Sequence, residues 1–349
     1  MHVLHLTPYM SLGGTERHIL NLIIQSLSRG YRISLASPPG EGLREIPDRV
    51  SVYKIRKWRG SKPLSSAKAL KEIILAVKDK IDLVQVHASA EMAYLTKKYL
   101  GKKPVIFTCH GYNTHPPYFN YWLAARFLKR TDCIVALTPE EKEYFLRGGI
   151  EENQLVVISN GVEERFFHSP SLPGNNDKVI GLVGRLVKEK NFTWAIKKQA
   201  KYRFASKLLI VGKGPYRHSL KKLVKKLKLE KEVIFLGYKE KMEKIYPLFT
   251  YLLISSHKEA FALVILEALA AGVPVLVPQW LFGVREFYGS APGVVIFRGG
   301  KDLAEKVKEG KERLKEDKIQ AFARNFLWKN IFDRYEQLYS QLLMRSKLQ

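Results

Sequence analysis

Two carboxylates and a run of small residues mark one segment as a candidate ligand site. The segment Ser255–Gly272 reads SSHKEAFALVILEALAAG and carries Glu259 and Glu267 eight positions apart. The pattern predicts a turn, then a short helix, then a buried strand in the following VPVLV. A helix N-terminus has unpaired N–H groups and the positive end of the dipole, so it can hold an anion. The small residues Ala260 and Ala262 would let these backbone donors approach a ligand.

The expected helix would present its backbone donors and both carboxylates to one bound molecule. Glu267 lies about two turns after the helix start, since an α-helix turns every ~3.6 residues. A ligand that carries phosphate and hydroxyl groups would satisfy this set, which is the chemistry of a nucleotide-sugar site. The alternative interpretation is an ordinary pair of solvated carboxylates, because Glu side chains are mostly exposed.

Two further loops carry groups that can hold phosphate. Gly13 and Gly14 lie between an expected strand and an expected helix, where a glycine pair lets N–H groups come close to a phosphate or sugar. They form neither the dinucleotide fingerprint nor a P-loop. Arg185 and Lys190 follow Gly184 at the carboxyl end of an expected strand, where open α/β sheets bind ligands, and they could clamp a diphosphate. The alternative is an exposed basic loop in a chain with 59 Lys and Arg residues.

Short apolar runs alternate with helical patterns along the chain, which predicts an α/β protein with parallel sheets. The expected strands are 2–6, 32–37, 82–87, 104–109, 133–137 and 155–160, then 179–184, 207–212, 233–237, 251–256, 273–277 and 294–297. Between the two sets lies HSPSLPGNND, a composition typical of a linker. A chain of 349 residues is long for one core. We therefore expect domains at 1–165 and 178–326, a linker at 166–177 and a C-terminal helix at 327–349.

Several motifs, in their order along the chain, resemble those of the retaining glycosyltransferases of family 4. They are Gly13-Gly14-x-Glu, Asn160-Gly-Val, Gly184-Arg-x4-Lys, Val211-Gly-Lys-Gly-Pro, Leu236-Gly-Tyr and the segment from Glu259 to Glu267. The resemblance covers nearly the whole chain. It departs from the family's pattern at Ala260 and Ala262, where the family has glycines. Alanine resists a positive φ angle, so this departure concerns the conformation of the loop.

The resemblance implies the GT-B fold, in which two Rossmann-like domains face each other across a cleft and a C-terminal helix crosses back to the first domain. By the same resemblance, Arg185 and Lys190 hold the donor's phosphates and stabilise the departing diphosphate, so neither a cofactor nor an essential metal is expected. Glu259 would bind hydroxyls of the donor sugar, and Glu267 those of the ribose. The expected donor contacts are Gly13, Gly14, Gly184, Arg185, Lys190, Gly212, Gly214, Tyr238, Ala260, Phe261, Ala262, Leu263 and Glu267.

Four histidines lie on or near expected strand ends in the first domain: His5, His87, His110 and His115. A lone histidine is most often structural. The family places a functional histidine after the strand that precedes His110, near the reacting carbon of the donor sugar, so the resemblance adds His110 to the catalytic set of Arg185, Lys190 and Glu259. The spacing of the histidines is not typical of a metal site, and the chain has no Asp-x-Asp motif.

Net charge is the unusual feature of the composition, at +26. Residues 54–71 contain seven Lys or Arg and no acid, with a tryptophan among them. A basic segment with an aromatic residue is typical of a membrane-surface loop, and the alternative is a solvated face that serves solubility. A second basic stretch, 217–231, has the apolar spacing of a helix with a basic outer face. The patch expected to contact a membrane or acceptor is Lys54, Arg56, Lys57, Trp58, Arg59 and Lys62.

Together these features predict an enzyme that moves a sugar from a UDP- or GDP-sugar to an acceptor hydroxyl. The expected acceptor is a lipid-linked saccharide or glycolipid of cell-envelope polysaccharide synthesis. The sequence shows no secretory leader and no apolar run of about 18 residues, and its two cysteines fit a reducing compartment. We therefore expect a cytoplasmic, peripheral enzyme on the inner face of the cell membrane.

Three alternative functions stay open from the sequence. Two share the fold and differ in chemistry: a nucleotide-sugar epimerase and a soluble sugar-phosphate glycosyltransferase. The third and most remote is a nucleic-acid-binding protein, which the positive charge alone suggests. The chain contains no recognisable nucleic-acid module, so we expect no specific nucleic-acid partner.

Overall fold

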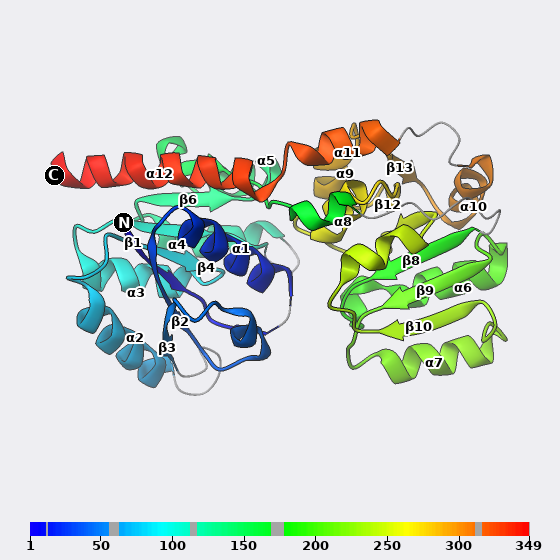
Figure 1. The fold of residues 1–349 in the computed structure, drawn as a ribbon, viewed down its shortest axis with the longest axis horizontal. Helices are drawn as coiled ribbons and strands as arrows, with labels where there is room; N and C mark the ends of the chain where they lie inside the picture. Colours follow the sequence, from blue (N-terminus) through cyan, green and yellow to red (C-terminus); the bar gives the residue numbers. More distant parts are fainter. Residues whose placement is uncertain (12, 56–62, 112–116, 169–177, 311–315, 349) are drawn as a thin grey trace. The chain divides into compact units, whose positions relative to one another are not determined.

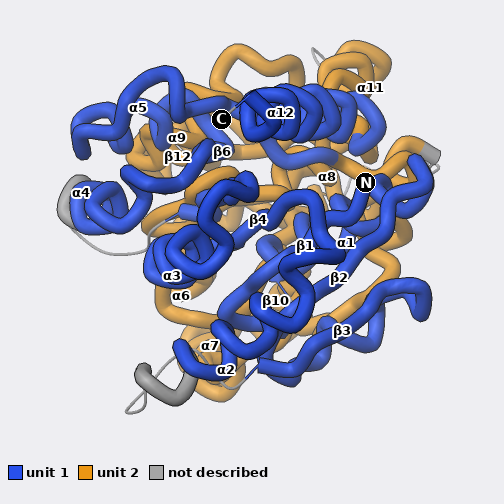
Figure 2. Tube along the Cα trace, turned by 90° about the vertical axis from the view of Figure 1, so that its left-hand side faces the viewer, with its two compact units in different colours: residues 1–161, 328–349 blue, residues 162–327 orange. Residues whose placement is uncertain are grey.

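The computed structural model describes residues 1–11, 13–55, 63–111, 117–168, 178–310 and 316–348 (Figure 1). The chain divides into two compact units (Figure 2). Unit 1 comprises Met1–Gly161 and Trp328–Gln349, and unit 2 comprises Val162–Leu327. The sequence-based boundaries were 165 and 327, and most of the expected linker, residues 169–177, lies outside the described residues.

Unit 1 contains a seven-stranded sheet with the strand order β3-β2-β1-β4-β5-β6-β7, in which every pair is parallel. Apolar runs such as those around Leu4, Val84 and Phe107 are fully buried, as expected for strands that are covered on both faces. The strands are β1 (His2–Leu6), β2 (Arg32–Ser37), β3 (Ser51–Lys54), β4 (Leu83–His87), β5 (Val105–Thr108), β6 (Cys133–Ala136) and β7 (Leu155–Val157). The helices are α1 (Gly14–Ser28), α2 (Pro63–Val77), α3 (Ala90–Leu100), α4 (Pro117–Leu128), α5 (Pro139–Arg147) and α12 (Trp328–Leu348).

The last helix of the chain, α12, belongs to unit 1 and packs on α1 (Figure 2). Its buried apolar residues recur every three to four positions, and Phe332, Tyr335 and Tyr339 are fully buried. Arg29, just after α1, donates to Asp333 at 2.5 Å and to Glu336 at 2.9 Å. The last helix of the chain thus packs against the first one.

Unit 2 contains a six-stranded parallel sheet with the order β10-β9-β8-β11-β12-β13. In the predicted helix over the second basic stretch, α7, Leu220 and Val224 are buried, which confirms the basic outer face. The strands are β8 (Val179–Val183), β9 (Lys207–Val211), β10 (Val233–Gly237), β11 (Tyr251–Leu253), β12 (Val275–Pro278) and β13 (Val294–Phe297). The helices are α6 (Phe192–Tyr202), α7 (Arg217–Lys226), α8 (Leu263–Ala270), α9 (Phe282–Tyr288), α10 (Gly300–Glu309) and α11 (Glu316–Arg324).

Each sheet reverses its strand order at one point. In unit 1 the reversal lies between β1 and β4, and in unit 2 it lies between β8 and β11. The two loops that leave the carboxyl ends of such strands diverge to opposite faces of the sheet, which leaves a crevice where ligands of open α/β sheets bind. Gly13 and Gly14 follow β1, Arg185 and Lys190 follow β8, and Glu259 follows β11, so these expected functional residues lie in the loops at the two reversals.

Candidate functional site

The loops after β8 and β9 in unit 2 pack backbone against backbone. Gly212 has a φ of 139°, and a Cβ atom there would lie 1.9 Å from the carbonyl oxygen of Gly184. The N–H of Gly184 donates to Val211 at 3.0 Å, and that of Leu186 donates to Lys213 at 2.9 Å. Gly184 and Gly212 therefore allow the loops after β8 and β9 to approach each other closely, next to the switch point of the sheet.

Lys190 and Glu259 connect the loop after β8 to the loop after β11. The Lys190 Nζ atom lies 2.6 Å from Glu259 Oε1, and the two side chains are 21% and 13% exposed. Ser256 Oγ donates to the same carboxylate oxygen at 2.5 Å, and Ser255 Oγ donates to the Lys190 carbonyl at 2.8 Å. The structure thus brings together two of the four residues that were assigned to catalysis, and Arg185 lies exposed on the first of these loops.

The loop after β11 ends in a strained residue. Ala262 precedes α8 with φ 56° and ψ 69°, in the left-handed region, which costs an L-residue roughly 1–2 kcal/mol. This is one of the two positions where alanine replaces the glycine of the family pattern. Leu263 then begins α8, whose first N–H groups have no intrahelical partners. Ala262 therefore adopts the positive φ angle that alanine resists, at a position where the family has glycine.

Glu267 lies on α8 and is held by a tyrosine that the sequence did not single out. Tyr246 donates its hydroxyl to Glu267 Oε2 at 2.6 Å, and its side chain is fully buried. Glu267 itself is half-buried. The pairing could not be read from the sequence because it joins a short 3₁₀ turn to a helix 21 residues later.

Two aromatic residues border the same edge of the unit 2 sheet. Tyr238 follows β10 and is 40% exposed, and the Nζ atom of Lys213 lies 5.4 Å from the centre of its ring. Trp280 follows β12, and its indole N–H donates to the carbonyl of Ser256 at 3.0 Å. Trp280 therefore anchors the loop that carries Glu259, and neither Trp280 nor Lys213 was predicted as a site residue.

The glycine pair of unit 1 opens α1. Gly14 is the first helical residue, and Gly13 before it is extended. Glu16 folds back to accept hydrogen bonds from Ser11 N at 3.0 Å and from Ser11 Oγ at 2.5 Å. This carboxylate therefore closes its own loop at the carboxyl end of β1.

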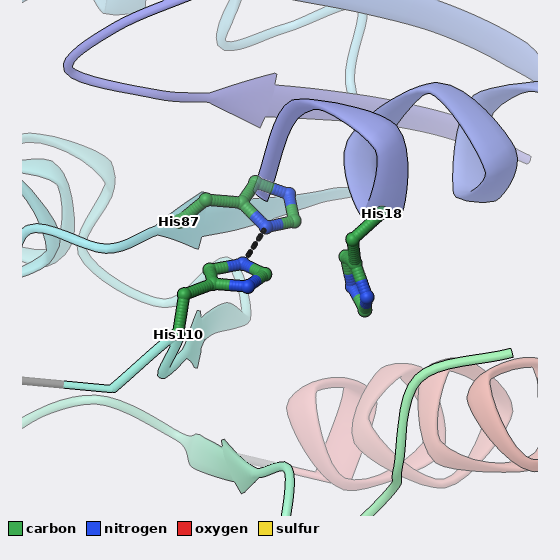
Figure 3. A group of neighbouring side chains, drawn as sticks. All are labelled: His18, His87 and His110. Carbon is green, nitrogen blue, oxygen red and sulfur yellow. Dashed lines mark hydrogen bonds between the residues drawn. The ribbon is translucent and has the colours of Figure 1, made fainter. Parts of the chain in front are cut away.

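A row of histidines lies at the switch point of unit 1 (Figure 3). His110, half-buried after β5, contacts His87 at the end of β4, with 3.2 Å between Nε2 and Nδ1. His87 Nε2 in turn lies 3.1 Å from Nδ1 of His5 on β1. His18 on α1 packs edge-on against His110, with ring centres 4.8 Å apart, and its Nδ1 donates to Asn160 Oδ1 at 2.5 Å. His18 was missed in the sequence because it lies inside a helix, away from any strand end.

Burial keeps these rings neutral. It lowers the pKa of His5 to about 3, helped by the positive charge that His18 would carry, and it lowers the pKa of His18 to about 4. The pKa values of His87 and His110 fall well below the ordinary range, first through burial and then through the neighbouring histidines. A neutral imidazole has one donor and one acceptor nitrogen, so the row can form a chain of N–H···N hydrogen bonds.

Three of these histidines form a loose metal-ligand group. His18, His87 and His110 offer ligand atoms that all lie within 4.8 Å of one another. Zinc–nitrogen bonds of about 2.0–2.1 Å would place tetrahedral ligand nitrogens only about 3.4 Å apart. The His87–His110 pair meets that distance at 3.2 Å, but both nitrogens of His87 already lie within hydrogen-bond distance of a neighbouring imidazole, one of His110 and one of His5. We therefore interpret the group as hydrogen-bonded imidazoles, and the expectation that no metal is needed stays a prediction.

Two of the sequence-based expectations fall partly outside the described residues. Lys54 ends the edge strand β3 and is exposed, but Arg56, Lys57, Trp58, Arg59 and Lys62 are not described, and neither is His115. Among the described helices, none is both long and apolar enough to cross a membrane.

Comparison with known proteins agrees with this architecture. Residues 163–324 match the family "Glycosyl transferases group 1", and residues 12–166 match "Glycosyltransferase Family 4". The crystal structure of Anabaena HepE in complex with UDP and glucose superposes with a TM-score of 0.82 over 98% of this chain and 100% of that chain, at 19% identity. The two-domain α/β fold is therefore of the GT-B class. The chain belongs to the glycosyltransferases of family 4.

Two curated relatives illustrate the range of this family. The N-acetyl-alpha-D-glucosaminyl L-malate synthase of Bacillus anthracis is 24% identical over 317 residues, covering 78% of this chain and 77% of the relative. The UDP-Gal:alpha-D-GlcNAc-diphosphoundecaprenol alpha-1,3-galactosyltransferase of Escherichia coli is 27% identical over 244 residues, covering 61% and 63%. The first name refers to L-malate, and the second refers to a sugar linked to diphosphoundecaprenol.

Proposed function

We propose that this glycosyltransferase transfers a sugar from a UDP- or GDP-sugar to a hydroxyl of a lipid-linked saccharide or glycolipid, with retention of the anomeric configuration. The observation that carries the donor half is the Lys190–Glu259 pair, which places a cation and a carboxylate side by side at the switch point of unit 2. A nucleotide sugar has an anionic diphosphate directly beside a hydroxyl-bearing ring. Lys190 is complementary to the diphosphate, and Glu259 can accept hydrogen bonds from the hydroxyls. The UDP complex of the HepE structure supports the choice of nucleotide class.

In this proposal Lys190 and Arg185 stabilise the charge that develops on the departing diphosphate. Charges aimed at the leaving group act most strongly where water is excluded, and they can replace a metal ion in that role. Glu259 accepts hydrogen bonds from the donor sugar, and Ser256 shares the same carboxylate oxygen and fixes its direction. His110, the last residue of the row of neutral histidines, is proposed to act near the reacting carbon of the donor sugar.

The acceptor half rests on different observations. Helix α4 exposes Trp122 and Leu123 next to Arg126, whose guanidinium lies 4.4 Å from the centre of the Trp122 ring. Exposed aromatic and basic residues on one helix are typical of membrane-interface contacts. The E. coli relative acts on a diphosphoundecaprenol-linked sugar. We therefore propose that this enzyme works peripherally at an anionic, cytoplasm-facing membrane surface.

The donor is tested by calorimetric titration with a panel of UDP-, GDP- and ADP-sugars. One donor class should bind, and Arg185→Ala and Glu267→Ala should each weaken it roughly ten- to a hundredfold, because charge-assisted bonds contribute ~1.5–3 kcal/mol. Lys231→Ala and Glu230→Ala are matched controls, since both residues are exposed and precede β10 at the opposite edge of the sheet. Failure of every donor to bind, or equal effects in the controls, would overturn the assignment of the site.

Reaction products then separate transfer from the same-fold alternatives. A transferase releases the nucleoside diphosphate only as fast as it glycosylates an acceptor, whereas an epimerase converts the nucleotide sugar without one.

Flotation with anionic and with zwitterionic vesicles tests the membrane proposal. Trp122→Ala should reduce binding to anionic vesicles, and equal recovery with both lipids would contradict it.

A further inference from the structure

The hydrogen bond from Tyr246 to Glu267 has the geometry of a positioning contact. Its length of 2.6 Å is that of a bond to a charged oxygen. The Tyr246 ring is packed edge-on against Phe166 and Phe249, with ring centres 5.9 Å and 6.0 Å away. Because the ring is fully buried in this aromatic contact, the hydroxyl has little freedom to turn away from the carboxylate.

A second buried tyrosine lies near the same carboxylate but is not bonded to it. Among the described residues, the hydroxyl of Tyr288 is buried without a hydrogen-bond partner. Burial raises the pKa of Tyr288, and the negative charge of Glu267 raises it further. Two tyrosines of similar burial thus flank Glu267, of which only Tyr246 donates to it.

A fixed carboxylate is useful for recognising a ribose. A glutamate side chain has several rotatable bonds, and freezing them on ligand binding costs affinity. The hydrogen bond that Tyr246 already donates to Oε2 lowers that cost and restricts the orientation of the carboxylate. Two adjacent hydroxyls on a ring require acceptors with a defined direction, since hydrogen bonds weaken steeply when bent.

We propose that Tyr246 is a positioning residue that fixes Glu267 for the ribose hydroxyls, so that the enzyme selects ribonucleotide donors over deoxyribonucleotide ones. This inference rests on the proposed function, in which Glu267 contacts the ribose. It adds a residue 21 positions away from Glu267 and a specificity that the proposed function does not contain.

The test compares the full-length protein with its Tyr246→Phe and Tyr288→Phe variants. Calorimetry would measure the affinity for UDP and GDP and for their 2′,3′-dideoxy counterparts. Tyr246→Phe should raise the Kd of the preferred ribonucleotide about tenfold, in line with the loss of one bond to a charged group. It should leave the Kd of the dideoxy compound within about twofold, because that compound has no hydroxyls for Glu267. Tyr288→Phe is the matched control and should change neither value.

The double variant Tyr246→Phe/Glu267→Gln distinguishes positioning from a general packing effect. If Tyr246 acts through Glu267, the double variant should bind the ribonucleotide no worse than Glu267→Gln alone, because interacting residues are not additive. Equal weakening of both nucleotides by Tyr246→Phe, or no weakening of either, would overturn the inference. If the wild-type protein bound none of the nucleotides, the proposed function would fail instead, so the two failures are distinguishable.

Discussion

Lys190 and Glu259 lie 69 residues apart in the chain, yet their side chains form an ion pair of 2.6 Å. They come from the loops that follow β8 and β11, the two strands between which the strand order reverses. The resemblance gave them separate tasks, one toward phosphate and one toward sugar. Their pairing means that the cation and the carboxylate orient each other before a donor arrives.

Removal of the charge from this pair should impair the reaction more than the fold. Glu259→Gln keeps the size of the side chain and a hydrogen-bond acceptor for Ser256, but it leaves Lys190 without its counter-charge. We expect the rate of sugar transfer to fall roughly a hundredfold or more, as for other groups that act on the transition state. Initial rates with the donor found by titration provide the measurement. Glu189→Gln, on the same loop and exposed, should retain normal rates.

The strain at Ala262 predicts a stabilising substitution. Ala262→Gly should raise the free energy of unfolding by about 1 kcal/mol, because glycine adopts the left-handed conformation at little steric cost. Ala260→Gly provides the comparison at the other position where the family has glycine. Ala260 is outside the left-handed region, so its replacement should lower stability by roughly 0.5–1 kcal/mol. Denaturant unfolding of both variants measures the difference, and a loss of stability in Ala262→Gly would contradict the argument.

The close approach of two loops makes one glycine irreplaceable. Gly212→Ala would place a Cβ atom 1.9 Å from the carbonyl oxygen of Gly184, so the loops after β8 and β9 must separate. We expect a loss of stability of several kcal/mol, as for severe backbone clashes, together with loss of nucleotide binding. Gly299→Ala is the control, because nothing lies within 4 Å of its Cβ position. Thermal melts with and without nucleotide report both effects, and a normal melt for Gly212→Ala would refute this description of the loops.

The neutral histidines predict a loss of stability in mild acid. In the unfolded chain each histidine takes up a proton near its ordinary pKa of 6.5, whereas His5 and His18 in the fold do so only near 3 and 4. Between these values the unfolded state binds more protons, so stability is complete above pH 6.5 and falls as the pH falls below it. Each of the two residues should lower the free energy of unfolding by about 2 kcal/mol between pH 7 and pH 5.

Unfolding by denaturant at several pH values tests this dependence. His18→Gln should reduce the slope of stability against pH by about one proton, whatever its effect at neutral pH. His218→Ala is the control, because His218 is exposed on α7 and lies outside the buried row of histidines. A wild-type stability that did not vary between pH 7 and pH 5 would rule out the buried neutral histidines.

The sequence predicted those parts of the fold that depend on local pattern. All twelve expected strands form, because parallel strands that are buried on both faces have continuous apolar sequences. The strand β3 was missed, since its residues are largely exposed and it forms the edge of the sheet. The strand expected at 251–256 ends at Leu253, because Ser255 and Ser256 leave the sheet to bond with Lys190 and Glu259.

The candidate site also has residues that the sequence predicted and residues that it did not. Glycines and cations after strands could be located from the sequence, since the carboxyl ends of parallel strands lie at one edge. The partners that orient these residues could not be located. Tyr246 reaches Glu267, and Asn160 reaches His18 across 142 residues, through contacts that exist only after the sheets have formed. No local pattern marks Tyr246, and the Asn160-Gly-Val motif does not show that Asn160 contacts His18.

The assignment of α12 to unit 1 has a consequence for synthesis on the ribosome. Arg29 and Glu336, which join α1 to α12, are 307 positions apart. At ~5–20 residues per second, Glu336 is made on the order of 15–60 s after Arg29. During that interval the whole of unit 2 is made and can fold, while the apolar face of α1 awaits its last neighbour. We therefore expect the half of the protein that is begun first to be completed last, and a nascent chain stalled before residue 328 to depend on chaperones for its N-terminal unit.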